Sequence, residues 1–155
     1  MLSTIGYEGA SLDNFIRTLV AAKVQVLIDI RERAQSRRKG FSKSALDAAL
    51  SNAGITYLHL RVLGDPKEGR EAARAGQMAR FRKIYSGVLR SSEAKAALKV
   101  IADASQRSSA CLLCYERDFE HCHRKLVSDK IESRTGRKTR HLGVKRFEQA
   151  ASLTR

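Results

Sequence analysis

Short apolar runs alternate with amphipathic segments of helical period along most of the chain. Residues 24–30 and 110–114 are predominantly apolar, which is typical of strands buried on both faces of a sheet. Between such runs the apolar residues recur every three or four positions, as Phe15 and Leu19 do. Strands that alternate with helices predict a mainly parallel sheet flanked by helices on both faces. We therefore expect a single three-layer α/β domain that spans residues 1–155.

Cap and turn residues set the expected boundaries of these elements. The predicted strands cover residues 3–7, 24–30, 55–60, 110–115 and 139–142. Helices are predicted after the N-cap residues Ser11 and Ser42, twice between residues 78 and 101, over residues 123–134 and from Lys145 onward. Residues 61–74 are polar and contain the only proline, so we expect an irregular connection that covers a site as a flap.

Chemically reactive side chains gather at the carboxyl ends of the predicted strands. In a parallel sheet these ends meet at one edge, and ligands bind in the crevice beyond it. The residues at or just after the strand ends are Tyr7, Glu8, Asp29, Arg31, His59, Cys114 and Glu116. We therefore expect one ligand pocket at this edge, formed by loops from several strands.

The connection after the fourth predicted strand, residues 114–124, is the richest of these segments in cysteine, histidine and charged residues. Cys122 lies where the next helix begins, and a helix N-terminus and a nearby arginine both stabilise a thiolate. Cys122 is therefore the candidate reactive thiol, with Glu116 or His59 as proton acceptor or orienting group. Cys111 points to the other side of its strand, because side chains alternate, and we expect it in the core.

The same segment allows two other interpretations. In the first, Cys122 only fills the start of the helix, and Glu116 forms a structural salt bridge with Arg31 or Arg124. The second is a phosphate cradle with Cys114 as the nucleophile, which would need an arginine six residues later. Position 120 holds a glutamate, whose charge would repel an anion. The likeness to phosphatases and rhodanese-like domains is therefore one of topology only.

A metal site is the remaining chemical alternative for this segment. Its ligands would be Cys114, His121, Cys122 and His123, with His59 as a further candidate from a neighbouring strand. Structural zinc usually takes two spaced pairs of ligands, and this chain offers one convincing group. We therefore predict no bound metal, and the sequence does not determine a cofactor.

Positive charge dominates the composition, because 30 lysines and arginines against 16 acidic residues give a net charge of +14. Such an excess favours nucleic acid or another phosphorylated partner. The candidates to bind phosphate or substrate are Tyr7, Asp29, Arg31, Arg37, Arg38, Phe41, Tyr57 and Arg124, with the aromatic residues stacking on a base or ring. Alternatively, the basic loops are solvated surface and Phe41 is a hydrophobic staple before Ser42.

Features of a membrane or secreted protein are missing from the sequence. No stretch approaches the roughly 18 consecutive apolar residues of a membrane helix, and the first residues lack a signal-peptide pattern. A cytoplasmic location without membrane contact is the resulting expectation. Three cysteines, an odd number in such a chain, then predict reduced thiols rather than disulfides.

Four segments together resemble a known family. They are residues 4–15, Asp29-Ile-Arg31 with Ser36, Arg37 and Phe41, Tyr57-Leu-His59, and Cys114-Tyr-Glu116 with Cys122-His123-Arg124. This combination resembles the domain-of-unknown-function family 488, DUF488, over most of the chain. The resemblance implies a compact α/β domain with these signature residues, and it implies no activity. The run Arg37-Arg38-Lys39-Gly40 departs from the more polar, proline-containing loop expected there.

Two functional hypotheses are consistent with these observations. In the first, the pocket binds or acts on a nucleotide or nucleic acid, with Glu116 and Cys122 in the chemistry and arginines holding phosphate. In the second, the protein is a non-catalytic nucleic-acid-binding module whose binding weakens steeply with salt, and the cluster is structural. A metal-dependent enzyme is the third possibility. The reaction, the substrate and the oligomeric state are not determined by the sequence.

Overall fold

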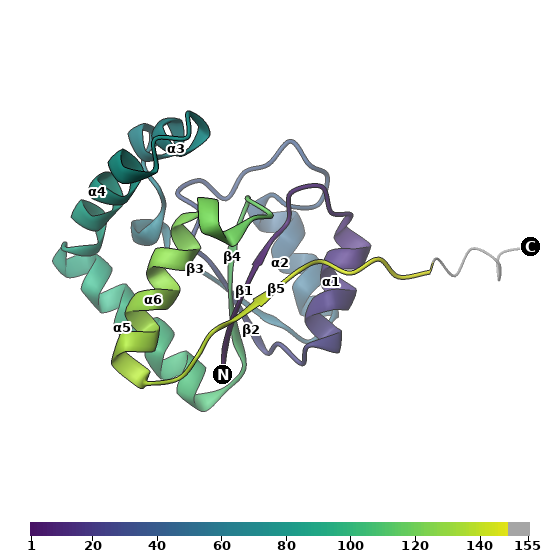
Figure 1. The fold of residues 1–155 in the computed structure, drawn as a ribbon. Helices are drawn as coiled ribbons and strands as arrows, with labels where there is room; N and C mark the ends of the chain where they lie inside the picture. Colours follow the sequence, from purple (N-terminus) through teal and green to yellow (C-terminus); the bar gives the residue numbers. More distant parts are fainter. Residues whose placement is uncertain (149–155) are drawn as a thin grey trace, which may run out of the picture.

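Five parallel strands form the centre of the computed structural model, which describes residues 1–148 (Figure 1). The strands are β1 (Leu2–Gly6), β2 (Val26–Asp29), β3 (Thr56–His59), β4 (Ala110–Cys114) and β5 (Arg140–Leu142). Their order in the sheet is β3-β2-β4-β1-β5, and every neighbouring pair is parallel. The predicted parallel sheet is confirmed, and each predicted strand lies within two residues of its expected bounds.

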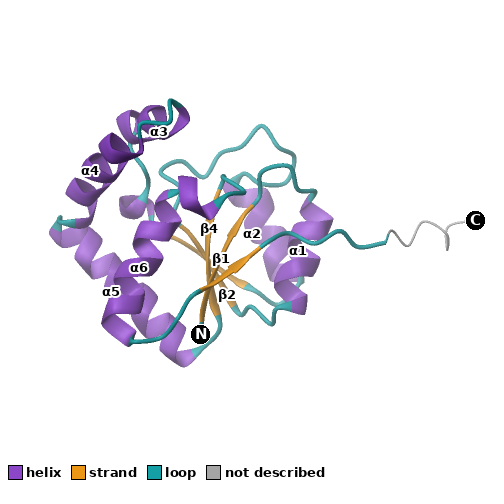
Figure 2. Ribbon diagram, in the orientation of Figure 1, coloured by secondary structure: helices purple, strands orange, loops and turns teal. Residues whose placement is uncertain are grey.

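Helices cover the sheet on both faces (Figure 2). In the described residues they are α1 (Leu12–Ala21), α2 (Lys43–Asn52), η1 (Arg61–Leu63), α3 (Lys67–Arg74), α4 (Met78–Leu89), α5 (Ser92–Arg107), η2 (Phe119–His121) and α6 (His123–Thr135), where η marks a short 3-10 helix. α1 and α2 lie on one face and α3 to α6 on the other, which gives the expected three layers. No helix within residues 1–148 combines the length and the apolar character needed to span a bilayer.

Two apolar clusters, one on each face of the sheet, hold the layers together. Leu27 packs with Phe15 of α1 and Leu46 of α2, whereas the adjacent Ile28 packs in the other cluster with Ile101 of α5. Successive residues of β2 enter different clusters because strand side chains alternate between the two faces. Burial of both faces explains why the strands are so apolar in sequence.

The carboxyl ends of β1, β2 and β4 lie side by side. Gly6 pairs with Cys114, and Asp29 pairs with Leu113. β1 continues into α1 on one face, whereas its neighbour β4 continues into α6 on the other (Figure 1). Adjacent strands whose connections leave to opposite faces form a crevice at their carboxyl ends, which is where open α/β sheets bind ligands.

Local capping explains where several helices begin and end. The Ser11 hydroxyl accepts a hydrogen bond from the backbone N–H of Asn14 at 3.1 Å, so the expected cap of α1 is confirmed. Ser42 also precedes α2 as expected, but its hydroxyl bonds to the backbone of Ser36. It thereby ties the loop between β2 and α2, residues 30–42, which we call the basic loop, to the helix. α6 ends at Gly136, whose φ of 73° is left-handed and suits glycine.

Two expectations about secondary structure were wrong or only partly testable. Residues 61–74 form η1 and α3 rather than an irregular flap. Pro66 caps α3, where its missing N–H costs no hydrogen bond, and Ala72 is buried against the core. Residues 145–148 are not helical, and the rest of the helix predicted from Lys145 lies outside the described residues.

Candidate functional site

A cavity of about 670 Å³ lies at the carboxyl edge of the sheet, and we refer to it as the strand-end pocket. Its walls come from the loop after β2, from α3 with the residues before it, and from the loop after β4. Seven of the candidate site residues line it: Tyr7, Arg31, Arg37, Arg38, Cys114, Glu116 and His123. The fold therefore brings together loops that are far apart in sequence, as the parallel topology requires.

The other predicted site residues lie beside or behind this pocket. His59 lines a neighbouring cavity of similar volume, and its Nε2 is 2.8 Å from the backbone carbonyl of Arg31. Phe41 is fully buried between Tyr7 and Phe15, with the Tyr7 ring stacked 4.5 Å from it between centroids. Phe41 thus packs in the core next to the pocket rather than within it.

Asp29 and Arg31 form a buried, bidentate salt bridge at the end of β2. The Asp29 carboxylate accepts hydrogen bonds from Arg31 Nε at 2.9 Å and Nη2 at 2.7 Å. Arg31 Nη1 donates to the Tyr7 hydroxyl and to the Phe41 carbonyl. Burial alone would lower the pKa of Arg31, but the hydrogen bonds and charge of Asp29 outweigh it and raise this pKa.

Tyr57 completes this buried network from β3. Its hydroxyl donates to Asp29 Oδ2 at 2.6 Å. Burial and this hydrogen bond both raise the pKa of Tyr57. Every hydrogen-bonding nitrogen of the Arg31 guanidinium, together with Tyr57, is thus engaged inside the protein, and the network holds the start of the basic loop.

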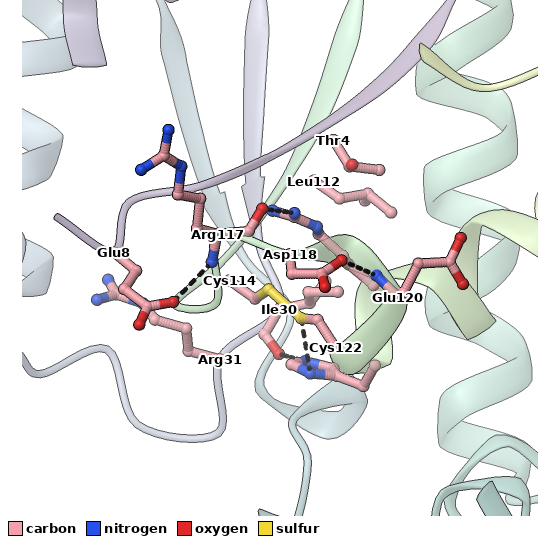
Figure 3. Close-up of a disulfide and its surroundings, with 12 residues drawn as sticks. Thr4, Glu8, Ile30, Arg31, Leu112, Cys114, Arg117, Asp118, Glu120 and Cys122 are labelled. Carbon is pink, nitrogen blue, oxygen red and sulfur yellow. Dashed lines mark hydrogen bonds between the residues drawn. A yellow bond between two sulfur atoms is a disulfide. The ribbon is translucent and has the colours of Figure 1, made fainter. Parts of the chain in front are cut away.

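Cys114 and Cys122 are joined by a disulfide at the floor of the pocket (Figure 3). Cys114 is the last residue of β4, and Cys122 is the N-cap of α6. The expectation of reduced thiols throughout was therefore wrong for this pair. Strand alternation places Cys114 and Glu116 on the pocket side, but only the path of the intervening loop brings Cys122 back to Cys114. Cys111 is free and fully buried, as predicted, and burial raises the pKa of its thiol to about 12.

His123 lies directly beside the disulfide. Its Nε2 is 2.8 Å from the backbone carbonyl of Ile30, and its Nδ1 is 3.7 Å from Cys122 Sγ. A carbonyl only accepts hydrogen bonds, so Nε2 carries the proton and Nδ1 presents its lone pair to the sulfur. Burial lowers the pKa of His123 to about 4, which keeps the imidazole neutral near pH 7. His121, by contrast, pairs with Asp118 on the surface.

Glu116 faces the pocket, whereas Arg124 lies behind it. Glu116 lines the pocket and forms no salt bridge with Arg31 or Arg124 within the described part of the chain. Burial raises the pKa of Glu116. Arg124 is 1% exposed and donates from Nη2 to the carbonyl of Arg117 at 3.1 Å. Arg124 therefore holds the loop after β4 in place from behind the pocket.

Arginines surround the mouth of the pocket. Arg33, Arg37 and Arg74 are exposed and form no salt bridge with any residue in 1–148. Arg70 pairs with Glu32 at 3.1 Å, and Arg38 donates to the Ala10 carbonyl. We call Arg33, Arg37 and Arg74 the free arginines of the rim.

Comparison with known proteins places the chain in a family. A family model described as a domain of unknown function, DUF488, matches residues 11–131. The chain belongs to the DUF488 family. No curated protein and no solved structure matches it. The description of the DUF488 family names no activity.

Asp65 is a pocket residue of the DUF488 chain that the sequence did not reveal. It is 6% exposed, it lines the pocket, and its Oδ1 has no hydrogen-bond partner within residues 1–148. Gly69 makes room for it, because a Cβ there would collide with Oδ1. Burial, and then the charge of Glu116, raise the pKa of Asp65 to about 7. The signal in the sequence was Pro66, which marks a helix start and places Asp65 beside it.

Asp65 makes the stability of the fold depend on pH. Its pKa is raised from 3.8 to about 7, so the folded protein binds a proton that the unfolded chain releases between these values. This contribution to stability is complete below pH 3.8 and is lost as the pH rises through about 7. In the wild type we expect Asp65 to lower the free energy of unfolding by up to about 4 kcal/mol between pH 4 and pH 8. Asp65→Asn should abolish this decrease, and urea unfolding at a series of pH values measures it.

An exposed aspartate on α5 provides the control for this pH dependence. Asp103→Asn changes an exposed residue and is expected to leave the pH profile of the unfolding free energy as in the wild type. If the Asp65→Asn profile also matches that of the wild type, the raised pKa of Asp65 is refuted.

Proposed function

We propose that the strand-end pocket binds a phosphorylated small molecule, with nucleotides as the first candidates, and acts on it as an enzyme. The observation that carries this proposal is the combination of free arginines at the rim with the buried Asp65, the half-buried Glu116 and a histidine at the floor. Concave pockets with a few convergent polar groups of shifted pKa are characteristic of active sites. A cytoplasmic location is part of the proposal.

The free arginines of the rim are assigned to the phosphate group. Guanidinium groups bind phosphate through paired N–H donors, and those of Arg33, Arg37 and Arg74 are exposed and unpaired within the described residues. Arg31 was also a candidate, but its donors are occupied by Asp29, Tyr7 and Phe41. Phosphate binding is therefore assigned to the free arginines of the rim and not to the buried Arg31.

Tyr115 is assigned to stack on the base or ring of the ligand. It lines the pocket, the residue is 47% exposed, and its ring meets that of Tyr7 edge to face at 5.3 Å between ring centroids. Exposed aromatic faces beside arginines stabilise a bound base by stacking. Phe41, predicted for this role, is fully buried, so Tyr115 replaces it in the proposal.

Asp65 and Glu116 are assigned to proton transfer. Both carboxyl groups line the pocket, burial raises the pKa of each, and the charge of Glu116 raises the pKa of Asp65 further. A carboxyl group with a pKa near 7 is suited to act as a general acid or base at neutral pH. The reaction class that follows is acid–base chemistry on a phosphorylated substrate.

Binding of nucleotides tests the phosphate assignment. We expect the double variant Arg37→Ala with Arg74→Ala to weaken binding of nucleoside monophosphates by about 10- to 100-fold, because two charged hydrogen-bond donors are lost. Calorimetric titration at low and at moderate salt measures the change. Arg107→Ala, an exposed arginine at the end of α5 and at the opposite edge of the sheet, is the matched control.

Two results would refute this binding mode. One is the absence of binding by any nucleotide at low salt, and the other is equal weakening by the Arg107→Ala control. A second basic segment, residues 134–146, carries Arg134, Arg137, Lys138, Arg140, Lys145 and Arg146 and no acidic residue. If a single-stranded oligonucleotide binds instead of a nucleotide, and only variants of this segment weaken its binding, the non-catalytic nucleic-acid-binding module replaces the enzyme. Glu116→Gln separates the two roles further, because it should stop conversion of a bound nucleotide, followed by mass spectrometry, while binding persists.

A further inference from the structure

Three ligand atoms of the kind that bind transition metals converge at the floor of the pocket. The sulfurs of Cys114 and Cys122 and a ring nitrogen of His123 all lie within 4.8 Å of one another. All three side chains are buried, and they come from the end of β4, the N-cap of α6 and the first residue of α6. The end of β4 and the start of α6 therefore hold the three ligand atoms in place.

The histidine is already oriented as a metal ligand. Its Nε2–H donates to the Ile30 carbonyl at 2.8 Å, so Nδ1 is the free nitrogen and faces Cys122 Sγ at 3.7 Å. Metal-binding histidines almost always donate their other N–H to such a backbone or carboxylate acceptor. Zinc bonds of about 2.0–2.1 Å to nitrogen and 2.3 Å to sulfur, at the tetrahedral angle, place these two atoms about 3.6 Å apart.

The backbone spacing of the cysteines suits an ion between them. Their Cα atoms are 7.5 Å apart. Bridged cysteines usually have Cα atoms about 4.4–6.8 Å apart, so the backbone leaves more room than a direct bridge needs. We propose that reduced Cys114 and Cys122, together with His123, bind a zinc-like divalent cation whose fourth coordination position opens into the strand-end pocket.

The fourth position follows from which of the three residues reach the pocket. Cys114 and His123 line the cavity, whereas Cys122 closes the site from the helix side. The other thiol and the neighbouring histidine are unsuitable as a fourth ligand: Cys111 is buried in the cluster of the α1 and α2 face, and His121 pairs with Asp118 on the surface. Three protein ligands and one open position are the arrangement of catalytic rather than structural zinc.

Metal binding and the disulfide exclude each other. A thiol or phosphine reductant supplies two electrons to the sulfur–sulfur bond, and two protons from solvent complete the two thiols. When the cation binds, both thiols release their protons to solvent and the thiolates coordinate, while the neutral imidazole donates its lone pair. Removal of two electrons by an oxidant forms the disulfide again and releases the ion.

A titration of the reduced protein with Zn²⁺ alone tests this site. Phosphine-reduced protein, kept without oxygen, competes with a chromophoric chelator, and we expect one ion per chain. The oxidised protein is expected to bind none. Cys122→Ser and His123→Gln should each weaken zinc binding by more than about 100-fold. Loss of a residue that only supports a ligand from the outer shell weakens binding by about 10- to 100-fold, so a larger effect identifies a direct ligand. Cys111→Ser and His121→Gln are the matched controls and should bind as the wild type does.

Substitution with Co²⁺ provides a test that needs no variant. Thiolate-to-cobalt charge-transfer bands and intense visible bands are expected in the reduced wild type, since they report tetrahedral sulfur ligation directly. Reduced protein that keeps its helical circular dichroism but takes up no ion, or shows a cobalt spectrum without thiolate bands, would overturn the proposal. Nucleotide binding is measured on oxidised, metal-free protein, so each of the two proposals fails or stands separately.

Discussion

Asp29→Ala is expected to lower the free energy of unfolding by about 3 to 5 kcal/mol. Asp29 is fully buried and holds the guanidinium of Arg31 through two hydrogen bonds. Without it, Arg31 keeps a positive charge in a site where only the Tyr7 hydroxyl and the Phe41 carbonyl remain as acceptors. The loss comes from this uncompensated buried charge, and urea unfolding at pH 7 measures it.

An exposed pair of the same residue types is the control for this variant. Arg17 and Asp13 of α1 lie 3.3 Å apart, with side chains 41% and 64% exposed. Asp13→Ala should therefore cost no more than about 0.5 kcal/mol. The double variant Asp29→Leu with Arg31→Met should recover part of the loss, because it removes both charges. Equal costs for Asp29→Ala and Asp13→Ala would refute the buried network.

The same network connects stability to the pocket. Arg31 lies at the start of the loop between β2 and α2 and donates to the Phe41 carbonyl at its end, and this loop carries Arg37 on the rim. Asp29→Ala is therefore expected to weaken nucleotide binding as well, even though Asp29 does not reach the cavity. Binding measured well below the denaturation midpoint separates this loosening from global unfolding.

Gly6→Ala is expected to destabilise the protein by about 3 kcal/mol or more. A Cβ at Gly6 would overlap the backbone carbonyl of Glu116 and lie 2.7 Å from Nη1 of Arg124. Backbone atoms cannot move aside as the end of a flexible side chain can, so β1 or the loop after β4 must shift. That loop carries Tyr115 and Glu116, so pocket geometry changes together with stability.

Gly143→Ala is the matched control for this clash. An added Cβ there meets no atom within 4 Å, and the residue is exposed. Its effect should stay within about 0.5 kcal/mol, which thermal and urea unfolding can both resolve. A Gly6→Ala protein with wild-type stability would show that the end of β1 does not pack against Glu116 as described.

The local pattern of apolar and capping residues was sufficient to predict most of the fold and the location of the site. The β2 strand was predictable from its unbroken apolar run, and the cap at Ser11 from the residue type and the helical spacing after it. The convergence of Tyr7, Arg31 and Glu116 followed from parallel topology alone, because that topology sends every strand end to one edge. α3 was missed because its sequence is polar and only Pro66 signals its start.

The roles of individual site residues were less accessible from the sequence. Arg31 was a natural candidate for phosphate, yet its guanidinium turns to Asp29, two residues earlier on the same side of the strand. Asp65 carries no motif, and its raised pKa arises from burial beneath elements that are distant in the chain. The orientation of Arg31 and the pKa of Asp65 both depend on which residues surround the charged group in the folded protein. The sequence pattern does not reveal those neighbours.

By itself, the sequence determined a parallel α/β fold, membership of DUF488, a strong positive charge and a pocket at the strand ends. The fold, the charge and the pocket follow from periodicity and composition, which each segment carries locally, whereas membership of DUF488 rests on the match of the family model to residues 11–131. Only the tertiary structure decided that Cys114 meets Cys122, that His123 turns its free nitrogen to their sulfurs, and that Asp65 is buried at the same pocket. The physical reason is that contacts across loops depend on how helices and strands pack, and the chemistry of a buried group depends on the neighbours that this packing supplies.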